Sequence, residues 1–198
     1  MLDTTTFRFW SKANRQGNSV KQRYEIILAG SGGQGLVFTG RVLGQAAILE
    51  GKNVVQTQSA TGDAQRGGLS VSELIIDKDE IIYQQVEQPD LILALSESAF
   101  KKYGASGTTV PLFYDSSASN PPDGKFAQGF PFAHVAESIS GGAANMVALG
   151  TIVSLLGVVQ LETLIKFMRK SFSDAVAQAN IKSVEAGAEV AKSLAAGK

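Results

Sequence analysis

The chain of 198 residues contains no cysteine and a single histidine, and these two scarcities exclude several kinds of site. Without cysteine it forms no disulfide, offers no thiol nucleophile and cannot hold zinc or an iron–sulfur cluster through its own thiolates. With His134 alone, it cannot assemble a multi-histidine metal site or a mechanism that needs a pair of histidines. Any iron–sulfur chemistry linked to this protein must therefore reside on another chain.

The sequence also lacks an excess of charge and a long apolar run. Lysine plus arginine and aspartate plus glutamate number 18 each, so no net field attracts nucleic acid or an anionic membrane. The longest apolar stretch, residues 143–159, is interrupted by Asn145, Thr151 and Ser154 and is shorter than the ~20 residues that a membrane span needs. We expect this stretch to form a buried helix, and we expect no nucleic acid and no membrane among the partners.

The first 22 residues differ in character from the rest of the chain. They are basic and have no continuous apolar core, which argues against a signal peptide or a membrane anchor. Phe7, Phe9 and Trp10 could dock on a partner, but a frayed extension is the simpler interpretation. We therefore predict an N-terminal extension over residues 1–22 and one domain over residues 23–198.

Apolar periodicity and turn residues predict an α/β fold with three layers, built on a mixed, mostly parallel sheet. Its first strand–helix–strand unit is Rossmann-like, and the C-terminal third is helical. We predict strands over residues 24–29, 53–57, 68–76, 91–95 and 109–114, a short apolar hairpin strand at Ile81 and Ile82, and helices over residues 36–50, 97–103, 144–156, 161–172 and 174–191.

The most informative stretch is a glycine-rich loop between the first predicted strand and the first predicted helix. The sequence YEIILAGSGGQG places Gly30, Gly32 and Gly35 at the spacing of the dinucleotide fingerprint, and Gly33 removes one more side chain. Without Cβ atoms, backbone N–H groups can approach a phosphate closely, and the helix adds the positive end of its dipole. We expect an anion-binding turn in which Gly32, Gly33, Gln34 and Gly35 are backbone donors.

The spacing of acidic residues argues against NAD as the ligand of this loop. A Rossmann-type nicotinamide enzyme needs an acid at the end of its second strand, roughly 20 residues after the first glycine. That spacing reaches Glu50, which lies at the end of the predicted helix and not at the end of a strand. A different phosphate-bearing ligand is favoured, while a glycine turn that only allows close packing stays open.

A second loop follows the second predicted strand and should lie beside the first, because both strands end at the carboxyl edge of the sheet. Residues 56–68 read QTQSATGDAQRGG, and Arg66 stands before Gly67 and a further glycine. A planar guanidinium presented there suits a phosphate or a carboxylate. The alternative is a solvated arginine or an ion pair with Asp63. Asp63 and Asp115 are weaker ligand candidates, for which a turn-forming role is the alternative.

Five short motifs in one order carry a family resemblance. They are GSGGQG at 30–35, TQS at 57–59, QRGG at 65–68, PDLILAL at 89–95 and NMVALG at 145–150. Together they resemble the gamma subunit, or gamma domain, of the 2-oxoacid:ferredoxin oxidoreductases, and the TQS and QRGG variants look closest to the 2-oxoglutarate branch. One segment departs from the pattern: ATGDAQ, before the Arg-Gly-Gly, lacks the tyrosine and the proline that many members carry.

This resemblance implies a cytoplasmic, hetero-oligomeric enzyme whose gamma subunit is inactive alone. The family converts a 2-oxoacid, coenzyme A and oxidised ferredoxin into acyl-CoA, CO2 and reduced ferredoxin. Thiamine diphosphate, Mg and iron–sulfur clusters of the 4Fe–4S type would belong to partner alpha, beta and possible delta subunits. The gamma module would help to bind coenzyme A and would orient it, chiefly a proximity effect. The implied site residues are Gly30, Gly32, Gly33, Gln34, Gly35, Arg66 and Gly67.

Two other functions stay open from the sequence. One is a self-sufficient enzyme that binds NAD or FAD through the glycine loop. The other is a non-catalytic scaffold in which the glycine loop is only a packing device. Binding of NAD by the isolated chain would favour the first, and a coenzyme A response that ignores Arg66 would favour the second.

Overall fold

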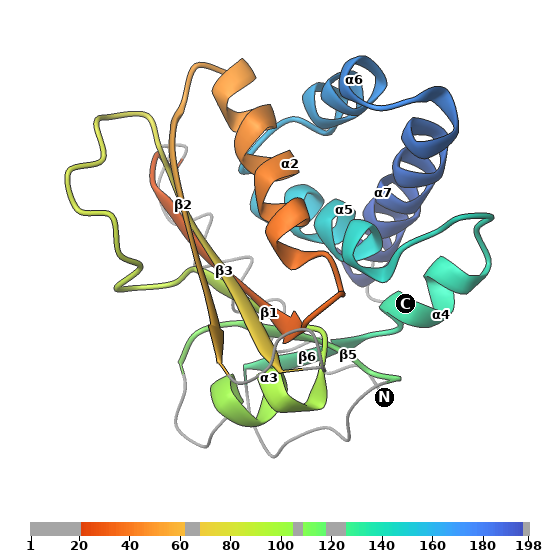
Figure 1. The fold of residues 1–198 in the computed structure, drawn as a ribbon, viewed down its shortest axis with the longest axis horizontal. Coiled ribbons are helices and arrows are strands. Elements are labelled where there is room, and N and C mark those ends of the chain that lie inside the picture. The colour runs from red at the N-terminus through yellow and green to blue at the C-terminus, as the bar shows by residue number, and fades with distance from the viewer. Residues whose placement is uncertain (1–20, 62–67, 105–108, 118–125, 196–198) are drawn as a thin grey trace.

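A six-stranded mixed sheet organises the part of the chain that the computed structural model describes, residues 21–61, 68–104, 109–117 and 126–195 (Figure 1). Its strand order is β2-β3-β1-β4-β5-β6. Strands β1, β4, β5 and β6 run parallel, whereas β3 is antiparallel to both of its neighbours. The strands are β1 (Tyr24–Ser31), β2 (Asn53–Thr61), β3 (Leu69–Asp77), β4 (Leu91–Ala94), β5 (Leu112–Asp115) and β6 (Ala127–Phe130).

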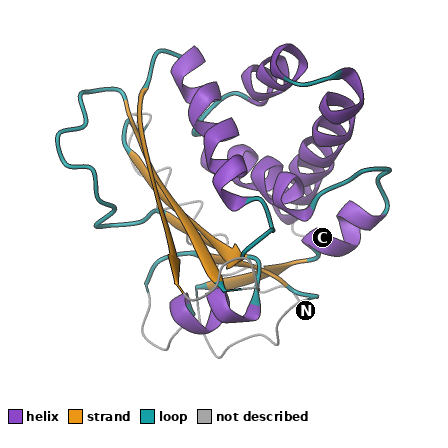
Figure 2. Cartoon of the chain, viewed as in Figure 1, coloured by secondary structure: helices purple, strands orange, loops and turns teal. Residues whose placement is uncertain are grey.

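Helices cover the two faces of this sheet unequally (Figure 2). Most of them gather on one face, and α5 and α7 pack directly against each other there. Helix α3 packs on the opposite face. The helices are α2 (Leu36–Leu49), α3 (Glu97–Tyr103), α4 (Phe132–Glu137), α5 (Ala144–Leu156), α6 (Leu161–Ser171) and α7 (Asp174–Ala195). The predicted α/β class with three layers and a helical C-terminal third is confirmed.

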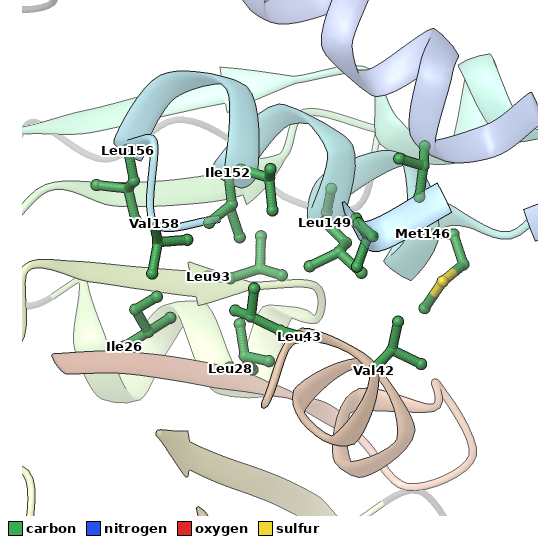
Figure 3. Close-up of a cluster of buried hydrophobic side chains, with 14 of the residues drawn as sticks. Ile26, Leu28, Val42, Leu43, Leu93, Met146, Leu149, Ile152, Leu156 and Val158 are labelled. Carbon is green, nitrogen blue, oxygen red and sulfur yellow. The ribbon is translucent and has the colours of Figure 1, made fainter. Parts of the chain in front are cut away.

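The alternation of β1 explains why this strand is apolar at nearly every position. Ile26 and Leu28 face the main helical layer, where they meet residues of α2 and α5 (Figure 3). Ile27 and Ala29 face the other way and pack with Phe100 of α3. A strand that is covered on both faces cannot alternate apolar with polar side chains, since each face buries its own set.

Strand β3 lies between β1 and β2 and interrupts the Rossmann-like unit. The unit β1–α2–β2 is present, but its two parallel strands are separated by the antiparallel β3. The predicted hairpin of β3 with a strand at Ile81 and Ile82 is wrong. Ile82 is 90% exposed, and β3 pairs with β2 instead. Adjacent Ile75 and Ile76 are both buried, which requires cover on both faces of the sheet.

The longest apolar stretch of the sequence forms helix α5, and most of its residues are buried. This confirms the predicted buried helix. Among the described residues, the structure contains no helix that combines the length and the apolar character of a membrane span. Helix α5 crosses α7 at two glycines: a Cβ on Gly150 would lie 2.8 Å from Val184 Cα, and a Cβ on Gly187 would lie 2.9 Å from Thr151 N. The two backbones are therefore in contact, with no room for a side chain between them.

Candidate functional site

The connections after β1 and β4 leave the sheet toward opposite faces, and they open the candidate site between them. The chain after β1 enters α2 on the main helical face, and the chain after β4 enters α3 on the other face. The carboxyl ends of these two adjacent parallel strands therefore form a topological switch point. Ligands of open α/β sheets bind in crevices of this kind. The glycine loop, residues 32–35, lies at this point (Figure 1).

Two glycines give the loop a shape that other residues adopt at a cost. Gly33 has φ 89° and Gly35 has φ 74°, both in the left-handed region. Gly35 is also the N-cap of α2, and no side chain caps the helix. The first amides of a helix have no intrahelical partner, and they carry the positive end of the helix dipole. The loop thus combines an exposed Gly33 with an uncapped helix start, an arrangement that suits an anion.

A backbone hydrogen bond joins the two predicted loops. The N–H of Gly32 donates to the carbonyl of Gly68 at 2.9 Å. Gly68 ends the QRGG motif, so the second loop returns to the sheet directly beside the glycine loop, as the sequence predicted. Arg66 and Gly67, two of the predicted site residues, lie outside the described residues, as does Asp63. The bond also means that the Gly32 amide has a partner within the protein.

The side chain of Gln34 ties the loop to the sheet. Its Oε1 accepts a hydrogen bond from the Ser31 N–H at 2.7 Å, and its Nε2 donates to the Leu95 carbonyl at 2.9 Å. This carboxamide therefore bridges the ends of β1 and β4. A Cβ on Gly30 would collide with the Gln34 carboxamide and would lie 2.8 Å from Leu36 Cδ1. Gly30 thus serves close packing beneath the loop.

Asn145, the first buried residue of α5, holds the loop from the helical layer. Its Nδ2 donates to the Gly35 carbonyl at 3.3 Å and to Thr39 Oγ1 at 3.1 Å, while its Oδ1 accepts from the Met146 N–H at 3.0 Å. From the sequence, Asn145 was placed in the family motif NMVALG and expected to cap or position the helix that it opens, with no link to the glycine loop. The N-cap of α5 is instead Ala143, without a side-chain cap. The contact joins residues 110 positions apart, a separation that no local pattern reveals.

The remaining polar candidates that the structure describes, Asp115 and His134, contact other groups of the protein. Asp115 accepts hydrogen bonds from the Ala133 N–H at 3.0 Å and from the Ser117 N–H and hydroxyl at 3.0 and 2.6 Å. The carboxylate thus holds the first turn of α4, a turn-forming role and not a ligand contact. His134 is exposed, with Nδ1 3.9 Å from a carboxylate oxygen of Glu137. No group of three or more residues of the kinds that ligate metals occurs within the described part of the chain.

Glu50 lies too far from the glycine loop to serve a nucleotide bound there. It is the C-cap of α2, and the 14 residues of this helix place it ~21 Å from Gly35. Its carboxylate accepts from the Gln160 N–H at 2.6 Å and pairs with Lys52. Burial alone would raise the pKa of Glu50, but these hydrogen bonds outweigh it and lower the pKa. The Glu50 carboxylate therefore joins the end of α2 to the start of α6.

A family model described as pyruvate ferredoxin/flavodoxin oxidoreductase matches residues 25–190. The chain belongs to this family. The 2-oxoglutarate synthase subunit KorC of Archaeoglobus fulgidus is 40% identical to it over 174 residues, which cover 84% of this chain and 87% of that protein. The KorC subunit of Methanocaldococcus jannaschii is 37% identical over 183 residues, 88% of this chain and 97% of that protein. The predicted resemblance to this family is confirmed.

One solved structure supports the same assignment, and a second shows the same fold. The keto/oxoacid ferredoxin oxidoreductase gamma subunit of Geobacter sulfurreducens is 35% identical with a TM-score of 0.69, covering 86% of this chain and 99% of that one. A 2-oxoglutarate:ferredoxin oxidoreductase from Magnetococcus marinus, described with 2-oxoglutarate, coenzyme A and succinyl-CoA bound, gives a TM-score of 0.76 at 22% identity. The match covers 87% of this chain and 32% of that one, and it demonstrates a shared fold.

Proposed function

We propose that this chain is the gamma-type subunit of a 2-oxoglutarate-type 2-oxoacid:ferredoxin oxidoreductase complex. The observation that carries this proposal is the 40% identity to a KorC subunit, extending over 84% of this chain and 87% of that protein. The complex converts a 2-oxoacid, coenzyme A and oxidised ferredoxin into acyl-CoA, CO2 and reduced ferredoxin. The chain is not active alone, because with no cysteine it cannot hold the clusters that pass electrons to ferredoxin.

The partners follow from this assignment. Alpha and beta subunits, with a ferredoxin-like delta subunit where one is present, carry thiamine diphosphate, Mg and the 4Fe–4S clusters. Electrons leave to ferredoxin, and the complex works in the cytoplasm. The domain that enters the complex is residues 23–198, preceded by the extension over residues 1–22. The formal net charge of zero favours packing against protein partners over binding to nucleic acid.

Coenzyme A is the phosphate-bearing ligand of the glycine loop in this proposal. Three features support it: the left-handed Gly33 and Gly35, the uncapped start of α2, and the return of the QRGG loop beside Gly32. Exposed Gly33 and the first amides of α2 bind a phosphate oxygen, and Arg66 and Gly67 of the QRGG motif are the further ligand residues of this proposal. When bound, coenzyme A supplies the thiol that receives the acyl group. The task of this chain is to hold that molecule in a fixed orientation beside a partner's centre.

Two experiments test the proposal. A tag on this chain should recover thiamine-binding and cluster-bearing subunits, and purification of the chain without them would contradict the complex. In the assembled enzyme, Arg66→Ala should raise the KM for coenzyme A roughly tenfold or more, since a charge-assisted hydrogen bond contributes about 1.5–3 kcal/mol. The matched control is Arg169→Ala, an exposed arginine on α6, which should leave the KM unchanged.

An unchanged KM for Arg66→Ala would contradict the coenzyme A site while leaving the subunit assignment in place. Calorimetric titration of the chain with NAD and with FAD tests the alternative, a self-sufficient enzyme that binds one of these cofactors. Tight binding of NAD by the chain would favour that class. We expect none, because Glu50 lies at the far end of α2 from the loop.

A further inference from the structure

We infer that the side-chain carboxamides of Gln34 and Asn145 are positioning residues for the coenzyme A phosphate, holding the glycine loop from two sides. The inference rests on the proposed function of this loop and adds residues whose side chains act without touching the ligand. Gln34 fixes the loop to the sheet, and Asn145 fixes it to the helical layer. Gln34 acts from within the loop, and Asn145 acts on its last residue, Gly35.

Asn145 adds a third hydrogen bond to those that fix the direction of the first helical amide. The Gly35 carbonyl accepts hydrogen bonds from the Thr39 N–H at 2.9 Å, from Thr39 Oγ1 at 3.0 Å and from Asn145 Nδ2 at 3.3 Å, so it points into the protein. In a trans peptide unit the carbonyl and the following N–H point in opposite directions. The N–H of Leu36 therefore points out of the helix start, toward the place where a phosphate would lie.

Gln34 performs the equivalent task on the sheet side. Its own N–H donates to the Ser31 carbonyl at 3.2 Å, while its side chain receives the Ser31 N–H and reaches the Leu95 carbonyl. Residue 34 thus closes a tight turn and anchors it to the next strand. Without the carboxamide, the turn keeps only its backbone bonds, and the left-handed Gly33 gains freedom to rotate.

The chemistry at both positions requires an amide group. Each carboxamide donates through nitrogen to a backbone carbonyl and accepts through oxygen from a backbone N–H. Only a side chain with a donor and an acceptor can do both, and a carboxylate has no donor. An aspartate or a glutamate would place a negative charge against the carbonyl, close to a bound phosphate. The neutral residues are therefore the ones that support an anion site.

The test uses the assembled enzyme with saturating 2-oxoacid and ferredoxin and measures the KM for coenzyme A and kcat separately. Gln34→Ala and Asn145→Ala should each raise the KM about fivefold to tenfold and change kcat by less than about twofold, the size of losing a neutral hydrogen bond. Gln34→Glu and Asn145→Asp should raise the KM further. Gln45→Ala, an exposed glutamine on α2, is the matched control and should change neither value.

The outcomes separate this inference from the proposed site. If Arg66→Ala raises the KM and both alanine variants leave it unchanged, the site stands and the positioning role is refuted. If Arg66→Ala also has no effect, the proposed coenzyme A site fails. A fall of kcat and melting temperature without a rise in KM would show that the carboxamides serve only the fold. If Asn145→Ala does not assemble, Gln34→Ala decides, because Gln34 lies in an exposed loop.

Discussion

Replacing Gly187 with alanine probes the contact in which α7 rests against α5. A Cβ at this position would overlap the carbonyl oxygen of Val147 and lie 2.9 Å from Thr151 N, and both obstacles are backbone. The helices would have to move apart. The same movement would stretch the hydrogen bond from Thr151 Oγ1 to the Gly187 carbonyl, now 2.9 Å.

The magnitude follows from three terms. Overpacking of this kind costs about 1–3 kcal/mol, and the stretched hydrogen bond costs about 1 kcal/mol. Alanine is favoured over glycine inside a helix by about 1 kcal/mol, which offsets the second term. The free energy of unfolding should therefore fall by about 1–3 kcal/mol, and the melting temperature by roughly 2–4 °C for each kcal/mol.

Urea unfolding followed by circular dichroism measures this difference, and Gly44→Ala is the matched control. Gly44 also lies inside a helix, but its added Cβ would meet only Val54 Cγ1, at 3.1 Å. That side chain can yield, so Gly44→Ala should be neutral or slightly stabilising through helix propensity. If Gly187→Ala proves as stable as Gly44→Ala, the backbone contact between α5 and α7 does not limit this fold.

Two further substitutions test buried carboxylates. Burial alone would raise the pKa of Glu25, but hydrogen bonds from Gln88, Arg23 and Glu87 outweigh it and lower the pKa below its usual 4.5. The stabilisation by the Glu25 carboxylate is therefore fully present above pH 4.5 and is lost as the pH falls through the lowered pKa. Glu25→Gln should lower the free energy of unfolding by about 1–3 kcal/mol at pH 7, and the difference should shrink progressively as the pH falls below 4.5. Urea titrations over this pH range that show a constant difference would contradict this. Asp115→Ala should lower the free energy of unfolding by about 1–2 kcal/mol and speed amide hydrogen exchange in α4, because the first turn of α4 loses its hydrogen bond. The KM for coenzyme A should stay unchanged, and a raised KM would place this carboxylate in the ligand site.

Local patterns predicted the elements whose signals lie within the elements themselves. Helix α3 follows Ser96, whose Oγ accepts the Ala99 N–H as an N-cap, and its predicted bounds match the structure. Helix α5 is mostly apolar and ends at the left-handed Gly157. The sequence thus contains the start signal of α3 and the stop signal of α5.

Elements that depend on distant pairing were not predictable in the same way. Strand β6 was missed, because its four residues include Gly129 and show no alternation; it forms only as an added parallel strand beside β5. The position of β3 between β1 and β2 was also missed, because the sequence of a buried strand does not show which strands it pairs with. The convergence of the two loops was predictable from strand direction, but the bridging carboxamides were not, since the register and the helix packing bring Asn145 to Gly35.

The pairing of β1 with β3 makes the geometry of the candidate site depend on the packing of the core. Leu28 lies opposite Ser72, and the same ladder ends with Ser31 opposite Leu69, one step before the Gly32–Gly68 bond. A slip of one residue would turn every β3 side chain to the other face and expose Leu74 and Ile76 to the wrong layer. Burial of these side chains thus fixes the register of β1 against β3, and this register fixes the positions of the two loops relative to each other. A substitution that keeps the protein folded therefore cannot shift one loop along the other. The distance between the glycine loop and Gly68 is determined by packing in the core and not by the loop sequences.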